Sequence, residues 1–536
     1  RIKQYHIRTA PKAVTLIIEL GGIYVKIGQV VSTIGSGILD DSYITALQPL
    51  QDGVPARDYE QISSIIEKST GRKMDDLFVH FEQIPIGSAS IAQAHRATLR
   101  PLSVSNQDTQ NNSYDEMGME YYAGEEVVVK VQYPEVAEQF NADFNNLELL
   151  VRIFMPTAID LIKSIRQRHE DELDFRKEAQ NLREVTRNMQ RHGLEPSIIR
   201  IPRVRNETGI CTQHVLAMEY LHGISLNSAI TDEQNKFAKA LGKSDAEELR
   251  SMLNKRIREH FERGGGSSDE NISIVGNDLK LKIAEVVGPF AASTFRFYAH
   301  TKDRVGNFLL GFRKIGATGP KNLSAGKMNS QLMEIDTTKQ QKQVKKKHFN
   351  LAKIIKTLVH VHGIQLLKDG VYNADPHPGN CLILPDGRLG LLDYGMVGRF
   401  SEEQRKIVAS VITALARKDK KETARWYIAQ GYEVTVRHEK KLLSNDINVI
   451  HRFATFHFDK VDFSKITLET GEKVDVLKLL RTAQERFVPV WAVQGQRLGG
   501  LLMGIAVQTA RPISLAKEWE QIASQTLKEM KSRTDS

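Results

Sequence analysis

Cysteine is almost absent from this 536-residue chain, which contains only two, and long hydrophobic runs are absent as well. Two cysteines cannot form a disulfide framework or a cysteine-rich zinc site, so we expect a reducing or redox-neutral compartment. No stretch reaches the roughly 18 apolar residues that a membrane-spanning helix needs, so we expect no transmembrane helix. The first residue is arginine rather than methionine, so any targeting segment is not visible in this chain.

Positive charge is not spread along the chain either. The net charge is +9, but residues 255–347 alone hold 18 Lys and Arg against 9 Asp and Glu, so the remaining residues sum to zero. A protein body that binds nucleic acid should carry its own basic face, so we expect no nucleic-acid partner. The hydrophobic fraction of 41% and the charged fraction of 26% exclude wholesale disorder.

Local patterns in the first 133 residues predict helices followed by strands. Residues 11–33 and 58–69 are predicted helices, and the second should end at Gly71. Residues 89–99 and 126–133 are predicted strands. A polar loop, residues 103–124, separates the two strands.

The rest of the chain is predicted to be mostly helical. Helical patterns occupy residues 135–166 and 170–191, and two short strands follow at 198–205 and 214–220. From residue 349 onward helices dominate, apart from one hairpin with strands at 381–384 and 389–392.

Residues 264–347 interrupt this order. They open with Gly-Gly-Gly-Ser-Ser, end in KQQKQVKKK and show little periodicity, so we predict a flexible or semi-ordered basic insertion. Such a segment is a solvated loop, a tether to an anionic surface or partner, or a gene-model artefact such as an unspliced intron.

The strongest chemical signal is the segment NADPHPGNCLILPDGRLGLLDYG, which runs from Asn373 to Gly395. It contains Asp375 and Asn380 five residues apart, then a hairpin, then Asp393 in an Asp-x-Gly triplet. Phosphoryl transfer with Mg²⁺ needs one carboxylate to position or deprotonate the attacking hydroxyl, and an amide oxygen and a second carboxylate to hold the metal. The spacing matches the catalytic loop of kinases and their metal-binding aspartate.

Two alternative roles for this segment stay open. Asp375 and His377 could ligate a transition metal in a hydrolase, although the helix-borne histidine pair that such enzymes often use is absent. Alternatively, the segment could be a purely structural Asp/Asn turn.

Lys130 lies in the apolar strand pattern VVVKV. A ligand phosphate or a buried acidic partner would explain a lysine there, and an edge strand with the lysine in solvent is the alternative. Asp174 and Glu178 are four residues apart on a predicted helix, so their carboxylates should share a face and attract Lys130 or Lys26. A solvated acidic face is the alternative for that helix.

These elements follow the order found in protein kinases, and the short motifs resemble one group of them, the UbiB-type atypical kinases. This protein-kinase-like group is tied to coenzyme Q and other isoprenoid-quinone lipids in bacteria, mitochondria and plastids. The resemblance covers residues 10–255 and 349–525. KIGQ, residues 26–29, is similar to the family's KxGQ motif, and GSASIAQAH, residues 87–95, to the alanine-rich loop that replaces the kinase glycine-rich loop.

The resemblance implies a role for each matching residue. Lys130 matches the strand lysine that holds the α- and β-phosphates, and Glu178 the helix glutamate that orients it. Asp375 matches the catalytic aspartate, and Asn380 and Asp393 the two Mg²⁺ ligands. Four further motifs are implied in nucleotide binding. The KxGQ motif supplies Lys26 and Gln29, and the alanine-rich loop supplies Gly87, Ser88, Ala89 and Ser90. Glu172 and Asp174 match the family's ExD motif, and Glu219 and Tyr220 match the hinge.

The sequence departs from the family pattern in three places. The family's catalytic loop usually reads HADPHPGN, whereas Asn373 replaces the first histidine here; a neutral asparagine can still hydrogen-bond the loop. The metal-binding triplet is Asp-Tyr-Gly rather than Asp-Phe-Gly, and Tyr394 can fill the same pocket. The third departure is the insertion, residues 264–347.

The resemblance implies an α+β, bilobed, protein-kinase-like fold with a small antiparallel-sheet N-lobe, a helical C-lobe and a helical N-terminal extension. The KxGQ extension would cover the protein-substrate groove and bring Lys26 to the ExD carboxylates. The predicted parts are the extension at residues 1–80, the N-lobe at 81–220, the C-lobe at 221–263 and 348–536, and the basic insertion at 264–347.

The implied function is that of an atypical kinase or ATPase that uses ATP and Mg²⁺ and supports isoprenoid-quinone or lipid metabolism at a membrane. Its implied partners are an anionic membrane surface and quinone-pathway proteins, and its implied location is peripheral to a membrane in a plastid or mitochondrion. A nucleotide-sensing pseudokinase scaffold without turnover is the alternative from another class. A lipid or small-molecule kinase of the aminoglycoside-kinase type is the second alternative, which the KIGQ helix disfavours.

Overall fold

The computed structural model describes most of the chain outside the basic insertion. The described residues are 2–20, 24, 41–47, 56–89, 91–100, 124–154, 159–206, 209–240, 242–246, 248, 350–431, 444–459, 490–509, 511 and 513–534. Several sequence predictions fall outside them, namely those for Lys26, Gln29, Ser90, residues 103–123 and residues 264–347.

An antiparallel five-stranded sheet forms the N-terminal part of the fold. Its strands run in the order β1-β3-β4-β6, and β2 pairs with β3. The strand bounds are β1 Phe78–Phe81, β2 Gly87–Ser88, β3 Ala92–Leu99, β4 Glu126–Gln132 and β6 Val215–Glu219. Side chains of β3 alternate between buried and half-buried positions, as expected for a strand with one face in a core. The predicted strands are therefore confirmed, whereas β1 was not predicted because its four residues give too short a pattern.

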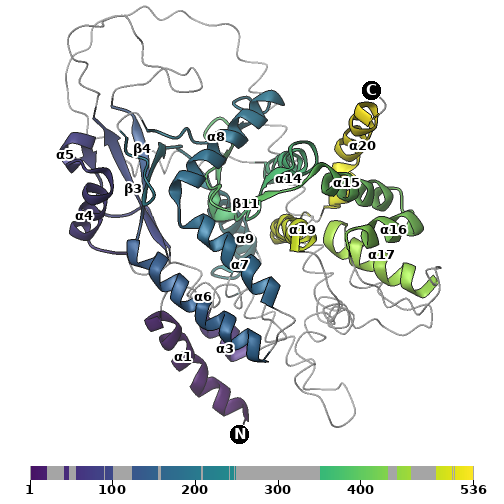
Figure 1. The fold of residues 1–536 in the computed structure, drawn as a ribbon, viewed down its shortest axis with the longest axis horizontal. Helices are drawn as coiled ribbons and strands as arrows, with labels where there is room; N and C mark the ends of the chain where they lie inside the picture. Colours follow the sequence, from purple (N-terminus) through teal and green to yellow (C-terminus); the bar gives the residue numbers. More distant parts are fainter. Residues whose placement is uncertain are drawn as a thin grey trace, which may run out of the picture.

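Helices cover both faces of this sheet (Figure 1). They are α4 Tyr59–Thr70, α5 Met74–Leu77, α6 Pro134–Phe154, α7 Ile159–Glu172 and α8 Phe175–Arg191. Ile62 and Ile66 of α4 pack with Val127, Val129 and Val131 of β4 in one hydrophobic cluster. The predicted end of α4 is confirmed, because Gly71 adopts the left-handed conformation with φ 69° and caps the helix.

Three predicted helix boundaries are wrong. The first helix, α1, spans Ile2–Leu20 and contains Pro11, whereas it was expected to begin there. Contacts with α3, Asp41–Leu47, hold α1 on both sides of the proline, because His6 packs on Tyr43 and Val14 on Leu47.

The long helical pattern at 135–166 is divided between α6 and α7, and α7 runs through the expected start of the next helix. Helix α6 ends at Phe154, two residues before a proline in the sequence, and residues that precede proline disfavour the helical conformation. Helix α8 begins only at Phe175, because Asp174 caps it from outside.

The C-terminal part is mostly helical, as predicted, and carries two small sheets. Its helices are α9 Leu226–Ala240, α14 Leu351–Ile364, η3 Gln365–Asp369, η4 Pro378–Asn380, α15 Glu402–Ala416, α16 Lys420–Ala429, α17 Ser444–Phe458, α19 Val490–Gln508 and α20 Leu515–Thr534. Its strands are β5 Ile199–Arg200, β7 Ile224–Ser225, β8 Val371–Asn373, β9 Cys381–Ile383, β10 Leu389–Leu391 and β11 Val397–Arg399.

The predicted hairpin is present as β9 and β10. Strand β5 is much shorter than predicted and pairs in parallel with β10, in a sheet ordered β5-β10-β9-β7. The pair β8–β11 was not predicted, because three-residue strands leave little pattern.

A second hydrophobic cluster joins β5, β8, β9 and β10 to the C-terminal helices. Trp519 of α20 is fully buried in it and donates its indole N–H to the backbone oxygen of Val359, 2.7 Å away. A Cβ atom at Gly363 would lie 2.5 Å from the Trp519 ring, so this close approach requires glycine. The cluster thus fixes α14 and α20 against the strands that carry the hairpin.

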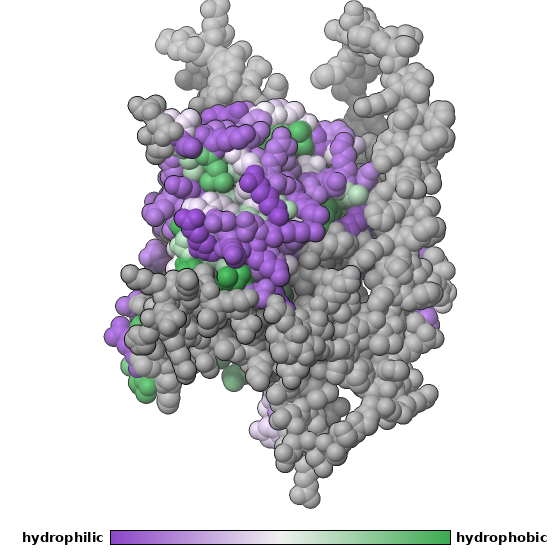
Figure 2. All heavy atoms as spheres, turned by 90° about the vertical axis from the view of Figure 1, so that its right-hand side faces the viewer, coloured by the Kyte–Doolittle hydropathy of each residue, from purple (hydrophilic) through white to green (hydrophobic). Residues whose placement is uncertain are grey.

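The face that carries α15, α16 and α17 is predominantly hydrophilic over the part drawn in colour (Figure 2). Hydrophobic residues appear there only as small separated spots. Among the described residues, no helix combines the length and apolar character that crossing a membrane requires. The mixed α+β class with antiparallel sheets is confirmed, and the predicted division into lobes, extension and insertion stays a prediction.

Candidate active site

Lys130 sits on β4, between β3 and β6, where a lysine cannot be an edge residue. Its neighbours Val129 and Val131 point into the hydrophobic cluster, so alternation turns Lys130 to the opposite face. There its Nζ atom lies 2.5 Å from Oε1 of Glu178 and 3.2 Å from Oδ2 of Asp393. The predicted pair of Lys130 with Glu178 is confirmed, and the edge-strand alternative is wrong.

Two carboxylates thus share one buried ammonium group. Burial alone would lower the pKa of Lys130, but Asp393 and Glu178 together raise it, so the lysine remains charged. Burial raises the pKa of Glu178 to about 7, although Lys130 opposes the shift. With all three groups ionised, the cluster carries one excess negative charge, and a bound cation would compensate it.

Asp393 is held in place by the triplet that it begins. Its Oδ1 atom accepts a hydrogen bond from the backbone N–H of Gly395 at 2.9 Å. Tyr394 is fully buried, and its hydroxyl accepts a hydrogen bond from Gln365 at 2.9 Å. The expectation that Tyr394 fills a pocket is confirmed, and the pocket includes a polar partner that phenylalanine could not use.

Asn373 connects the loop that carries Asp375 with the segment that carries Asp393. Its side-chain oxygen accepts from the backbone N–H of Asp375, and its Nδ2 donates to the backbone oxygen of Asp393, both at 2.8 Å. Gln365 in turn accepts from the backbone N–H of Asn373 at 3.2 Å. The prediction that an asparagine can hydrogen-bond this loop is confirmed.

Asn380 lies beside Asp393 because of the hairpin between them. The backbone oxygen of Asn380 accepts from the N–H of Leu392 at 3.0 Å, which continues the register of Cys381 with Leu391. Asn380 contributes a side-chain amide and Asp393 a partly exposed carboxylate, and both carry the oxygen ligands that Mg²⁺ prefers. The donor chemistry and the excess negative charge therefore fit Mg²⁺.

The transition-metal alternative gains no support from the described residues. None of their His, Cys, Asp and Glu side chains gather in a group of three that could hold a metal ion. His377 instead uses Nδ1 to accept from the backbone N–H of Gly379 at 3.1 Å, and so caps the short helix η4.

Asp174 and Glu178 do not share a helix face, so that prediction is wrong. Asp174 lies outside α8 as its N-cap, and its carboxylate accepts from the backbone N–H of Arg176 at 3.0 Å. The Arg176 guanidinium, 2.8 Å away, lowers the pKa of Asp174, so its cation is Arg176 rather than Lys130. Glu172 ends α7, and the expected contact of Lys26 with these carboxylates lies outside the described residues.

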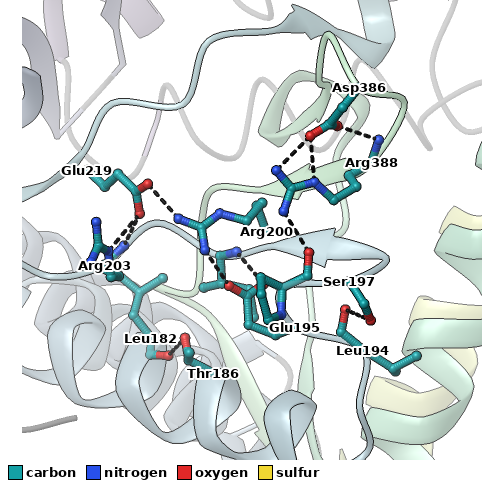
Figure 3. Close-up of polar contacts among 12 residues, drawn as sticks. Leu182, Thr186, Leu194, Glu195, Ser197, Arg200, Arg203, Glu219, Asp386 and Arg388 are labelled. Atoms are coloured by element: carbon teal, nitrogen blue, oxygen red, sulfur yellow. Dashed lines mark hydrogen bonds and ion pairs between the residues drawn. The ribbon is translucent and has the colours of Figure 1, made fainter. Parts of the chain in front are cut away.

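Of the hinge residues, Glu219 is the last residue of β6 and Tyr220 follows it, and both carboxylate oxygens of Glu219 are paired there (Figure 3). One oxygen lies 2.6 Å from Nη2 of Arg200 and the other 3.3 Å from Nε of Arg203. The backbone N–H of Glu219 donates to Arg203, and that of Tyr220 to Glu126. Sequence reasoning missed the two arginines, because their chain position gives no sign of the hinge.

Arg200 also connects this hinge network to a buried acid. Its Nη1 atom lies 2.9 Å from Oε1 of Glu195, whose second oxygen accepts from the backbone N–H of Ile201. Burial raises the pKa of Glu195 to about 7. On the neighbouring hairpin, Arg388 pairs with Asp386 and reaches the backbone oxygen of Pro196 (Figure 3).

The described part of the alanine-rich loop begins with β2. Gly87 and Ser88 pair with β3, and the N–H of Ala89 donates to the oxygen of Ala92 at 2.8 Å. Among the described residues, apart from the chain neighbours of Gly87, no atom lies within 4 Å of a Cβ placed at Gly87.

Arg497 was not predicted to belong to the site. It lies on α19, and its Nη2 atom is 3.4 Å from Oδ1 of Asp375. It is the only charged residue in the 19 residues of α19, VWAVQGQRLGGLLMGIAVQ. A lone charge in an apolar helix was the one signal in the sequence that could have drawn attention to it.

A family profile described as "ABC1 atypical kinase-like domain" matches residues 49–104, 120–260 and 328–427, more than half of the chain. The matched residues include Lys130, Glu178, Asp375, Asn380 and Asp393. Arg497 lies beyond the match.

Curated relatives agree with this profile. A probable serine/threonine-protein kinase, abkB of Dictyostelium discoideum, is 29% identical over 229 residues, which are 42% of this chain and 30% of the relative. AarF domain-containing protein kinase 1 of Mus musculus is 27% identical over 241 residues, 44% of this chain and 40% of the relative. An uncharacterised AarF domain-containing protein kinase of Arabidopsis thaliana, named as chloroplastic, is 28% identical over 237 residues, 42% of this chain and 39% of the relative.

The aligned regions thus span well under half the length of these relatives. Among solved structures, an erythromycin complex of Rv3197 from Mycobacterium tuberculosis covers 97% of each chain at 17% identity with a TM-score of 0.47. From the profile match and the kinase names of its relatives, the chain belongs to the ABC1 atypical kinase-like family, the UbiB-type group that its motifs resemble.

Proposed function

We propose that the chain binds Mg-ATP in a bilobed kinase fold and transfers the terminal phosphoryl group to a hydroxyl or to water. The observation that carries this proposal is the meeting of Lys130 with both Glu178 and Asp393. A buried ion cluster contributes less to stability than well-packed apolar residues would, so its presence indicates chemistry. A lysine for phosphates beside an aspartate for a metal is the arrangement that phosphoryl transfer needs.

Each residue of the cluster would have a separate task. Lys130 would hold the α- and β-phosphates, and Glu178 would keep its ammonium group aimed at them. Mg²⁺ held by Asn380 and Asp393 would neutralise charge on the phosphates. Asp375 would position the attacking hydroxyl or water and accept its proton.

The hinge and the alanine-rich loop would bind the rest of the nucleotide. The N–H groups of Glu219 and Tyr220 already donate within the protein, so adenine would meet their carbonyl oxygens instead. Gly87, Ser88 and Ser90 would offer backbone groups to the phosphates, and Ala89, whose N–H already donates to Ala92, would only line the site. Lys26, Gln29, Glu172 and Asp174 remain predicted contributors.

The test is a titration of Mg-ATP combined with measurement of phosphate release. Wild type should bind and turn over Mg-ATP, Asp375→Asn should bind with turnover reduced to a small residual rate, and Asp393→Asn should lose the Mg²⁺ dependence of binding. Asp386→Asn, on the exposed turn of the same hairpin, is the matched control and should behave as wild type. Absence of nucleotide binding in wild type would contradict the proposal, and binding without release would favour the pseudokinase scaffold.

We further propose a role in isoprenoid-quinone or lipid metabolism at a plastid or mitochondrial membrane. The support is the resemblance to UbiB-type proteins, together with the chloroplastic Arabidopsis relative. The basic segment 264–347 would supply attraction to anionic lipid, about 1 kcal/mol for each basic residue near the surface. Vesicles with anionic lipid should bind the full chain more tightly than a variant with this segment replaced by a short Gly/Ser linker, at equal nucleotide affinity. Equal vesicle binding by both would contradict this part.

A further inference from the structure

Helix α19 brings a cation to the proposed catalytic aspartate from outside the part of the chain that matches the family. Arg497 and Asp375 are 122 residues apart in sequence, yet Nη2 lies 3.4 Å from Oδ1. The side chains of both residues are close to half exposed, at 44% and 40%. An ion pair so accessible to solvent contributes little to stability, so a structural role accounts poorly for it.

Helix α19, which carries Arg497, packs tightly against neighbouring elements. A Cβ atom at Gly499 would lie 2.4 Å from the backbone oxygen of His457, so α19 and α17 touch there. Leu498 and Leu502 are fully buried on the same side of the helix. Arg497 therefore projects from a fixed support.

Helix α19 is also connected by aromatic contacts to the strand that precedes Asp375. Trp491 of α19 packs edge-to-face on Phe400 with ring centroids 5.5 Å apart, and Phe400 packs edge-to-face on Tyr372 at 5.1 Å. Tyr372 lies in β8, three residues before Asp375. Helix α19 and the catalytic loop thus share one aromatic anchor, which fixes the distance between Arg497 and Asp375.

The chemistry of the pair suits a carboxylate that must keep one orientation. Arginine stays charged at any physiological pH, and its planar guanidinium restricts the orientation of a carboxylate beside it. The backbone N–H of Asp375 is already fixed by Asn373, so Arg497 supplies the contact to its side chain. The backbone and the side chain of Asp375 are thus held from two directions.

We propose that Arg497 is a positioning residue that holds the carboxylate of Asp375 aimed at the phosphoryl acceptor. This inference rests on the proposed phosphoryl transfer. It predicts that Arg497 affects the chemical step rather than nucleotide affinity, because the contact is with Asp375 and not with Lys130, Asn380 or Asp393.

The test compares Arg497→Ala, Arg497→Lys and Val493→Ala in the full chain. Val493 lies one turn earlier on the same exposed side of α19 and serves as the matched control. We expect Arg497→Ala to lower kcat about 10- to 100-fold, as misplacement of a catalytic group does, with the Mg-ATP dissociation constant within about twofold. Arg497→Lys keeps the charge and should recover part of the rate, and Val493→Ala should match wild type.

A second comparison separates positioning from a general effect on folding. In an Asp375→Asn background, Arg497→Ala should lower the residual rate no further, because both changes act on one group. A further loss there, or an Arg497→Ala enzyme as fast as Val493→Ala, would overturn the inference while leaving phosphoryl transfer intact. A wild-type chain that binds Mg-ATP without any turnover would overturn the proposed function and this inference together.

Discussion

The side-chain amide of Asn373 donates to the backbone oxygen of Asp393 across 2.8 Å, and this bond joins the two halves of the proposed active site. The same side chain accepts from the N–H of Asp375. Asn373 itself is buried, and both of these hydrogen bonds are partly buried. One residue thus sets the position of the proposed base relative to the proposed metal ligand.

Asn373→Ala should therefore weaken both the fold and the chemistry. Losing these two partly buried hydrogen bonds costs about 2 kcal/mol of unfolding free energy. Turnover should fall by more than the loss of folded protein explains, because Asp375 is no longer held in position relative to Asp393. Chemical denaturation and phosphate release measure the two effects.

Asn373→His is the control for this prediction, since histidine is the usual family residue there and can still donate a hydrogen bond. It should retain more activity than Asn373→Ala. Equal activity in the alanine and histidine variants would show that the bridge is irrelevant to the site.

The second prediction concerns the buried pair of Lys130 and Glu178. Lys130→Met should destabilise the protein by about 3–5 kcal/mol, because it leaves the buried carboxylate of Glu178 without its cation. Glu178→Gln in the same chain should restore much of that loss, so the double variant should be more stable than the sum of the two single changes allows. Unfolding midpoints in urea for the four proteins complete the cycle. Strictly additive changes would mean that the two side chains do not interact in solution.

Asp393→Asn should have the opposite profile, with chemistry lost and stability kept. Removing one of the two carboxylates that share Lys130 relieves the excess negative charge of the cluster, and the amide still accepts from Gly395. Without nucleotide, thermal unfolding should occur at or above the wild-type temperature. Titration with Mg-ATP should then fail to stabilise the variant, whereas wild type should gain stability as binding requires. Equal stabilisation of both proteins by Mg-ATP would remove Asp393 from the metal site.

Much of this site could be predicted because its residues sit in strong local patterns. Lys130 interrupts a run of valines, and Asp375, Asn380 and Asp393 are separated by a hairpin that turn chemistry predicts. The position of Asp174 was predicted wrongly because a helical sequence pattern does not show where the helix begins. Asp174 is four residues before Glu178 whether it lies in the helix or caps it from outside, so the spacing cannot distinguish the two.

The remaining errors depend on contacts between distant segments. Strand β5 pairs with β10, almost 200 residues later, and nothing near Ile199 indicates that partner. Arg200 and Arg203 acquire their role only when β6 brings Glu219 beside them, and Arg497 only when α19 packs on Phe400. Local propensity carries no information about such pairings, so they require the structure.

The last prediction follows from a histidine buried in α14. His362 is completely enclosed; its Nδ1 is 2.8 Å from the backbone oxygen of Leu358, and its Nε2 has no hydrogen-bond partner among the described residues. Burial lowers the pKa of His362 from 6.5 to about 4. The unfolded chain therefore takes up a proton at a higher pH than the folded protein does, so stability is lost as the pH falls from about 6.5 to 4. The contribution of His362 to this loss approaches about 3 kcal/mol at the acidic end.

His362→Gln should flatten the dependence of unfolding free energy on pH in that interval, even if it lowers stability at every pH. His457, whose pKa burial also lowers to about 4, should leave part of the slope in place. His360 is exposed on the same helix, so His360→Gln is the matched control and should keep the wild-type slope. Urea unfolding at several pH values between 4.0 and 7.5, a range chosen to span both values, gives the slopes directly. A slope in His362→Gln as steep as that of His360→Gln would mean that His362 takes up its proton without unfolding the protein.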